Sequence, residues 1–485
     1  MSALRAIPGP RALPVLGPAR ELLRFLRDPI AAVGKLFESY GQITALVVGA
    51  RTRIVSTEPN PPGTIFLYGP ELMHSLLTNH TDFHKCGLAG PLYPSDPITE
   101  RKRPVTRMLT GLFHVNEGEH KQHRRLLMPA FHRSRIESYR DEMVRATESL
   151  LEKYRPGTVR DVRPDMMEVT LRIATSTLFG EDLGERGLQI GREVEEWGVV
   201  FRSAAIFPFD LPRSPYRRWL DLAHAVDRGI HDVIREKRAR SATGKDMLSM
   251  LLEARDEGGA SLTEDELVGH AGVIFAAGHE TSSNALGWTL FLLAQHPAVM
   301  ADLCDELAAK LHGDAPSFDQ LAELPLLDRV VKESLRIFPP APLNHRVTAR
   351  DSSLGEYHIP AGTEVLASIY HTHRMSELYP DPLVFRPDRW VGLDPGPYAF
   401  NPFSAGPRMC IGATFALFEI KIVLALLLQR FRFELVPNQI INRQFTITMS
   451  PAPRVLMRIE RRGRAYARAA NVRGNVHEMV RLAQN

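Results

Sequence analysis

The sequence predicts a single domain that is mainly helical, with small β-sheets. Helical signals run almost without interruption from Gly118 to about Leu311, and the strand-like segments are short and lie mostly outside that stretch. We find no repeat, flexible linker or candidate boundary before residue 460. At ~150 residues per domain the length suggests three domains, but one large core that wraps a cofactor is equally compatible with it. We therefore expect one domain over residues 1–460 and a basic C-terminal extension over residues 461–485.

The chain begins with a proline-rich leader over residues 7–17, which should be extended because proline restricts its own backbone and that of the preceding residue. Strands are expected near residues 43–48 and 64–68, and helices near residues 119–131, 137–154, 166–179, 188–201 and 216–239. The longest helix should cover residues 264–295. Thr263 and Glu266 form a capping box at its start, and Pro297 marks its end. Such a helix is ~48 Å long and would cross the whole molecule.

The last third of the chain is richer in loops and short strands than the helical segment before it. After a helix that ends near Ile337, residues 339–408 are rich in loops, with short strands near 356–359 and 364–369. A further helix should follow Cys410, and strands are expected near residues 431–435 and 455–458. In the basic extension, the apolar residues Val476, Met479, Val480 and Leu482 favour an amphipathic helix over a frayed end.

Composition excludes several classes of protein. Hydrophobic residues make up 44% and charged residues 24% of the chain, as in ordinary globular proteins. Three cysteines cannot supply a disulfide framework or a four-thiolate iron–sulfur cluster. The N-terminus lacks a signal peptide, and no apolar run is long enough for a membrane anchor, so we expect a cytoplasmic protein. The net charge of +4 is concentrated in the basic extension, and nothing indicates nucleic-acid binding.

The most informative segment is the loop that ends at Cys410. Glycine and proline shape this loop directly before an apolar helix, where the helix N-terminus and unpaired backbone N–H groups favour a thiolate. Gly406 permits a turn that a side chain would block, and Arg408 is suited to an acidic group on a ligand. A cysteine held in this way suits ligation of haem iron, whereas the plainer alternative is a buried structural cysteine.

The pattern Phe403-x-x-Gly406-x-Arg408-x-Cys410-x-Gly412 resembles the haem-binding signature of the cytochrome P450 family. The resemblance implies the single-domain fold of that family, in which the haem lies between the long central helix and the helix after the cysteine loop. It further implies haem b (iron protoporphyrin IX) as the cofactor, with Cys410 as the axial ligand of the iron and Phe403 beside the haem.

Three further segments fall in the order that this family shows. Residues 277–282 of the long helix resemble its oxygen-activation motif, in which Gly278 leaves room for a diatomic molecule while Thr281 and Glu280 manage protons, with a local bulge of the helix. A packing glycine and a threonine bonded to its own helix are the alternative.

By resemblance, Glu333 and Arg336 form a buried structural network with Arg389. There Trp390 replaces the family's usual phenylalanine, which we interpret as a change of packing and not of chemistry. By resemblance also, the haem propionates would be bound by His120, Arg124, Arg346 and Arg408.

The resemblance implies a monooxygenase that inserts one atom of dioxygen into an apolar small molecule: a fatty acid, a terpenoid or a polyketide. Because the chain holds no second redox centre, electrons should come from an external ferredoxin or flavodoxin with an NAD(P)H-dependent reductase. Lys121, Arg125, Arg133 and Arg135 form a candidate docking face for an acidic donor. The alternatives are a haem-thiolate peroxygenase or isomerase, and a haem-thiolate ligand sensor without catalysis. Both are disfavoured by the intact acid–alcohol pair.

The substrate pocket should be apolar, with residues drawn from three segments: 86–113, 199–211 and the helix around Ile274. Arginines in the first segment mildly favour a carboxylate on the substrate. The residues assigned to this pocket are Leu88, Leu92, Ile98, Phe201, Ile206, Phe207, Phe209 and Phe275, with Arg101, Lys102, Arg103 and Arg107 nearby.

Overall fold

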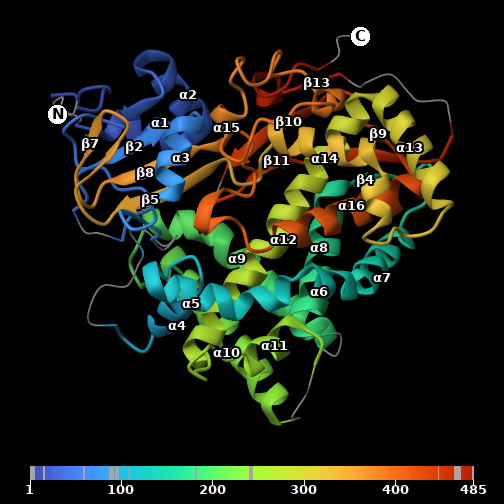
Figure 1. Ribbon diagram of the computed structural model, residues 1–485, viewed down its shortest axis with the longest axis horizontal. Coiled ribbons are helices and arrows are strands. Elements are labelled where there is room, and N and C mark those ends of the chain that lie inside the picture. Colours follow the sequence, from blue (N-terminus) through green and yellow to red (C-terminus); the bar gives the residue numbers. More distant parts are fainter. Residues whose placement is uncertain are drawn as a thin grey trace.

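The computed structural model describes residues 6–14, 17–57, 60–86, 92, 98–108, 110–180, 183–239, 244–445, 447–463 and 471–482. Several strands lie beside the N-terminal helices on one side of the molecule, and the remaining strands lie among the C-terminal helices on the other side (Figure 1). None of the helices in these ranges is both long and apolar enough to cross a membrane. The predicted mainly helical class with small sheets is therefore confirmed.

The strand-rich part is built around one five-stranded sheet in the order β1-β2-β8-β5-β3. Only β2 and β8 run parallel, and the other neighbours are antiparallel. Its strands are β1 (Ile43–Ala45), β2 (Thr64–Leu67), β3 (Phe83–His84), β5 (Leu343–Thr348) and β8 (Glu364–Ser368). The leader lies along β1, because Ala45 and Val48 donate backbone hydrogen bonds to Pro8 and Pro10. The helices of this part are α1 (Ala19–Arg27), α2 (Pro29–Tyr40), α3 (Pro70–Thr78) and α15 (Ile369–Thr372).

The helical part packs around α12 (Glu264–Gln295), which has the predicted bounds. The predicted capping box is present: Thr263 Oγ1 accepts the N–H of Glu266, and Glu266 Oε2 accepts the N–H of Thr263. Most of the C-terminal two thirds of α12 is buried in the main core. The surrounding α-helices are α4 (Arg103–Met108), α5 (Glu117–Leu127), α6 (Arg133–Ser138), α7 (Arg140–Leu151), α8 (Val162–Phe179), α9 (Gly184–Ile206), α10 (Pro215–Ala239), α11 (Met247–Glu253), α13 (Pro297–Leu311), α14 (Pro325–Ile337) and α16 (Ala413–Arg430).

Two small sheets and a hairpin complete the fold. One sheet has the order β11-β10-β13, the other β4-β12-β9, and β6 pairs with β7. The strands are β4 (Val159–Asp161), β6 (Ser352–Leu354), β7 (Tyr357–Ile359), β9 (Phe431–Leu435), β10 (Gln439–Phe445), β11 (Met449–Pro453), β12 (Leu456–Arg461) and β13 (Val472–Arg473). Short 3-10 helices include η2 (Met128–Phe131), η4 (Gln320–Glu323), η5 (Pro387–Trp390), η6 (Gly406–Arg408) and η7 (Asn475–Glu478).

The C-terminal segment differs from the expected amphipathic α-helix. Residues 472–482 form β13, which pairs in parallel with β10, and then η7. Val476, Met479 and Val480 are fully buried in the main core. These apolar residues therefore pack into the main core from a short 3-10 helix and the residues after it, and not from one face of an α-helix. Residues 464–470 lie outside the described ranges.

Candidate active site

The loop before α16 holds Cys410 by backbone geometry. Cys410 N–H donates to the carbonyl of Phe403 at 2.9 Å, and Met409 N–H donates to the carbonyl of Gly406 at 3.0 Å. Gly406 has a φ of +70°, and a Cβ at this position would lie 2.5 Å from the carbonyl oxygen of Leu77. Only glycine therefore fits here, as the sequence predicts. Phe403 is half-buried against the main core.

Opposing effects act on the pKa of the Cys410 thiol. Burial by the surrounding protein raises the pKa of the thiol, while the N–H of Gly412 and the Arg124 guanidinium lower it. Arg124 is held in place because its Nη1 donates to the carbonyl of Met409 at 2.9 Å. The predicted support from the N-terminus of α16 is therefore present but is opposed by desolvation.

Four predicted propionate ligands form a cationic cluster beside this loop. Arg408 Nη2 donates to the carbonyl of Val115 and to Asn116 Oδ1, each at 2.5 Å, which ties the cysteine loop to the start of α5. On β5, Arg346 Nη1 donates to Asn344 Oδ1 at 2.6 Å, and its Nη2 is buried without any hydrogen-bond partner. His120 and Arg124 come from α5. We call this set, His120, Arg124, Arg346 and Arg408, the cationic cluster.

The cationic cluster lacks a counter-charge. In the described ranges none of its members forms an ion pair with a carboxylate. Burial and the Arg408 charge lower the pKa of Arg346 to about 9, and burial and Arg124 lower that of Arg408 to about 10. Burial, followed by the charges of Arg408 and Arg124, also lowers the pKa of His120 to about 3, so this imidazole is neutral at pH 7 and the three arginines carry the positive charge of the cluster. Because buried cations without partners are costly, this donor set fits a bound group with two negative charges, such as the propionates of haem.

Helix α12 carries the predicted oxygen-activation residues. A Cβ on Gly278 would meet nothing within 4 Å, so open space lies beside the helix at this point. Thr281 Oγ1 donates to the carbonyl of Ala277 at 2.8 Å, and the helix continues without a break. The bulge that the sequence suggested here is therefore absent from α12.

Glu280 is held by a contact that the sequence did not indicate. Thr448, in the turn between β10 and β11, donates to Glu280 Oε1 at 2.5 Å, and Asn284 Nδ2 donates to Thr448 Oγ1 at 3.0 Å. Burial raises the pKa of Glu280, and the hydrogen bond from Thr448 partly offsets that effect. A half-buried carboxyl with a raised pKa holds its proton more tightly than an exposed one, which is a property of residues that act as proton donors.

Glu333, Arg336 and Arg389 meet in a buried network, as the resemblance implies. Arg336 donates to both oxygens of Glu333 at 2.9 Å, and Arg389 Nε donates to Oε1 at 2.8 Å. Trp390 adds a further contact, because its indole N–H donates to Glu333 Oε2 at 3.0 Å. The interpretation of Trp390 as a change of packing alone was therefore wrong, since a phenylalanine cannot make this hydrogen bond.

The predicted pocket residues separate into three groups. Phe275 is fully buried and stacks on Phe179, so it belongs to the core and does not line a pocket. Leu92 is likewise buried in the main core, and Phe201 is half-buried against it. Ile98 and the apolar residues at the end of α9 and after it are exposed; they are Ile206, Phe207, Phe209 and Leu211. Leu88 lies outside the described ranges.

The arginines of the first pocket segment are already paired. Arg101 donates to Asp210 and Asp221 at 2.7 and 2.9 Å. Arg107 lies 3.1 Å from Asp227 and 2.8 Å from Asp265, and Arg103 lies 2.6 Å from Glu100. These ion pairs weaken the argument for a carboxylate on the substrate.

Other residues near the site carry no recognisable motif. Lys85 lies close enough to Arg346 and Arg408 that both lower its pKa, although burial is the main cause of a value well below the usual range. Together with His114 and Asn116 it borders a polar cavity of about 650 Å³. These residues lie far from the cysteine loop in sequence, so no local pattern connects them.

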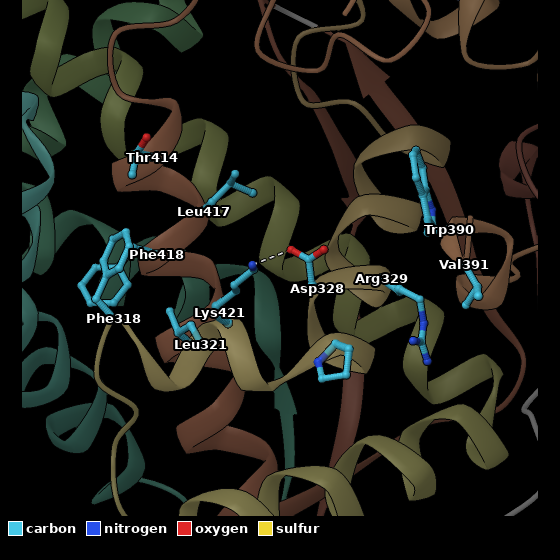
Figure 2. A pocket seen from close by; sticks show the side chains of 12 residues that line it. Phe318, Leu321, Asp328, Arg329, Trp390, Val391, Thr414, Leu417, Phe418 and Lys421 are labelled. Atoms are coloured by element: carbon cyan, nitrogen blue, oxygen red, sulfur yellow. Dashed lines mark hydrogen bonds and ion pairs between the residues drawn. The ribbon is translucent and has the colours of Figure 1, made fainter. Parts of the chain in front are cut away.

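A second cavity is lined by other residues than those described above. It is a groove of about 630 Å³ between α14, α16, η4 and η5, and none of its lining residues is a predicted site residue. Figure 2 shows Lys421 reaching across it to Asp328, and the two side chains are 2.6 Å apart.

The predicted basic docking face is partly neutralised by ion pairs: Arg133 pairs with Glu137 and Asp319, and Arg125 pairs with Glu257. The exposed Lys121 and Arg135 have no ion pair in the part of the chain that is described.

Known proteins resemble this chain over nearly its whole length. The family model described as "Cytochrome P450" matches residues 7–458. Pentalenene oxygenase of Streptomyces avermitilis is 30% identical, over 93% of this chain and 97% of that protein. Cyclooctat-9-en-7-ol 5-monooxygenase of Streptomyces melanosporofaciens is 32% identical, over 79% of this chain and 83% of that protein. Among solved structures, a cytochrome P450DA heme domain has a TM-score of 0.79 and 25% identity, over 95% of this chain and 99% of that one.

Proposed function

The chain belongs to the cytochrome P450 family and is a haem-dependent monooxygenase, and we propose that its substrate is a neutral terpenoid. The observation that carries this proposal is the pairing of Arg101, Arg103 and Arg107 with carboxylates. A fatty acid would be recognised best by an unpaired cation, and these three arginines already form ion pairs. Of the basic residues predicted near the pocket, Lys102 alone forms no ion pair among the described residues.

Two further observations support a neutral substrate. The segment at the end of α9 exposes large apolar side chains, with Ile206 and Phe209 exposed by 73% and 59%. Exposed apolar groups gathered in one segment mark a site where an apolar partner or ligand binds. In addition, two relatives are named for the oxygenation of pentalenene and of cyclooctat-9-en-7-ol.

We assign roles to the chain's own residues as follows. Haem supplies the chemistry of dioxygen activation when bound, and Cys410 is the thiolate that ligates its iron. His120, Arg124, Arg346 and Arg408 bind and orient the propionates. Open space lies beside α12 at Gly278, where an added Cβ would meet no atom within 4 Å. Glu280, oriented by Thr448, delivers protons to the hydroxyl of Thr281.

An external partner supplies the electrons, and we propose an acidic ferredoxin with its NAD(P)H-dependent reductase; a flavodoxin is the other candidate. Lys121 on α5 and Arg135 on α6 are exposed and offer positive charge, and Met128 of η2 and Met409 of the cysteine loop are each 44% exposed. Apolar contacts within a cationic rim suit a transient complex that is steered by charge. Reversing both charges, in Lys121→Glu with Arg135→Glu, should slow reduction at low salt and abolish most of its salt dependence. Reduction kinetics unchanged by this variant would overturn the assignment of the docking face.

A ferric spin-state titration tests the substrate class. We expect neutral sesquiterpene hydrocarbons and alcohols to give a saturable low-to-high-spin shift, and fatty acids and macrolide polyketides to give a weaker one. The variant Asp210→Asn with Asp221→Asn frees Arg101, so its response to fatty acids should increase. A wild-type protein that prefers fatty acids, or a variant without that gain, would contradict the argument from ion pairing.

A further inference from the structure

A second cluster of potential ligands lies outside the residues assigned to the haem. Glu119 and His123 are one turn apart on α5, so their side chains share one face of that helix. Glu266 comes from the first turn of α12. One ligand atom from each of these three residues lies within 4.8 Å of the others. We call Glu119, His123 and Glu266 the triad.

Two members of the triad are oriented by neighbouring groups. Glu266 Oε2 accepts the N–H of Thr263 at 2.7 Å, which leaves Oε1 directed at His123 Nε2, 3.3 Å away. His123 is only 4% exposed, and its Nδ1 lies 3.2 Å from Nε2 of the buried His270. When His123 donates its Nδ1 proton to His270, its Nε2 lone pair faces the carboxylates. Histidine ligands of metals are typically oriented in this way by a second group.

The third member, Glu119, is exposed and can approach the other two ligand atoms. Glu119 is exposed, and no ion pair or hydrogen bond of its carboxylate occurs among the described residues. Ligand atoms around a four-coordinate zinc ion lie ~3.4 Å apart, given metal–ligand bonds of about 2.0–2.2 Å. The present separations therefore require a movement of only ~1–1.5 Å, which a mobile surface glutamate can make.

We propose that the triad binds one divalent cation of the zinc class, which joins α5 to the first turn of α12. Imidazole nitrogen and carboxylate oxygen are both zinc ligands, and the three protein ligands of the triad would leave one position for water. The two carboxylates balance the charge of the ion. Magnesium should bind more weakly, because it requires near-octahedral coordination by oxygen and loses its water reluctantly.

Zinc binding to the untagged, haem-loaded protein tests this proposal, after treatment with a chelator. By equilibrium dialysis with radioactive zinc we expect one equivalent bound, and a loss of affinity of at least tenfold in Glu119→Gln and in Glu266→Gln. Glutamine at position 266 can still form the capping box, so α12 should remain intact. The control Glu117→Gln removes the same charge from α5 outside the triad and should bind zinc like the wild type.

Thermal unfolding supplies a second readout. Zinc should raise the unfolding midpoint of the wild type and of Glu117→Gln, but not that of Glu119→Gln. Absence of binding, one equivalent that survives both triad substitutions, or tighter binding of magnesium than of zinc would each overturn the proposal.

Discussion

The buried carboxyl of Glu419 should make the folded protein less stable as the pH rises. It lies on α16, nine residues after Cys410, and is only 1% exposed. Neither carboxyl oxygen has a hydrogen-bond partner of good geometry, and burial raises its pKa to about 8 although the nearby Ser282 hydroxyl lowers it. Between pH ~4.5 and ~8 the unfolded chain is ionised at this residue while the folded protein keeps the proton. Folding then takes up a proton, so stability falls as the pH rises.

The size of the effect follows from the two pKa values. A tenfold difference in proton affinity is worth about 1.4 kcal/mol, so raising the pKa from 4.5 to about 8 costs the folded state roughly 4–5 kcal/mol once the pH exceeds 8. At pH 5 the cost is below ~1 kcal/mol. Glu419→Gln keeps the shape of the side chain and removes its titration. Relative to the wild type, this variant should therefore gain stability steadily between pH 5 and pH 8.

Urea unfolding of the haem-loaded protein at pH 5, 6.5 and 8 measures this difference. A matched control is Glu148→Gln, an exposed residue on α7 whose substitution should shift the free energy of unfolding by less than ~0.5 kcal/mol at every pH. If Glu419→Gln and the wild type differ by the same amount at all three pH values, the reasoning about the buried carboxyl is refuted.

Three further substitutions test the site. Trp390→Phe preserves the ring but removes the N–H that donates to a buried carboxylate at 3.0 Å, so urea unfolding should show a loss of ~1–3 kcal/mol; no loss would restore the packing interpretation. Thr281→Ala should retain haem yet divert most reducing equivalents to peroxide, measured as peroxide formed per NAD(P)H consumed, and tight coupling would exclude its assigned role. Gly406→Ala, which forces a φ of +70° on alanine and a clash with Leu77, should cost at least ~1–3 kcal/mol and lower the haem content, whereas Gly118→Ala on α5 has room for a methyl group and should be neutral within ~1 kcal/mol.

Elements with local signals could be predicted from the sequence. The bounds of α12 follow from Thr263 and Glu266 at one end and Pro297 at the other, because helix caps depend on residues within one turn. The turn at Gly406 was likewise predictable from the loop's composition. The strand β5 was missed, since it is stabilised by β8 and β3, which lie elsewhere in the chain. Its Arg346 entered the predicted site through the family resemblance alone.

Contacts between distant residues account for the other differences. The hydrogen bond from Thr448 to Glu280 joins residues 168 positions apart in the sequence, and that from Trp390 to Glu333 joins residues 57 positions apart. No local sequence pattern encodes either hydrogen bond. In the C-terminal segment the spacing of Val476, Met479 and Val480 fits both an amphipathic α-helix and a short 3-10 helix. Pairing of β13 with β10 decides between them, and that pairing is a tertiary effect.

Helix α5 shows why bound groups matter to the stability of this fold. Its buried side chains are His120, His123, Leu126 and Leu127, so half of the buried positions are imidazoles and not apolar anchors. An ordinary surface helix is held by an apolar stripe. On α5, His120 and Arg124 belong to the cationic cluster, with Arg124 bonded to the carbonyl of Met409, and His123 lies against Glu266 of the first turn of α12. Polar contacts therefore make up a large share of what positions this helix, and in the proposed roles of these residues bound haem would add further ones. It follows that loss of haem should loosen α5 before it loosens the apolar core around α12.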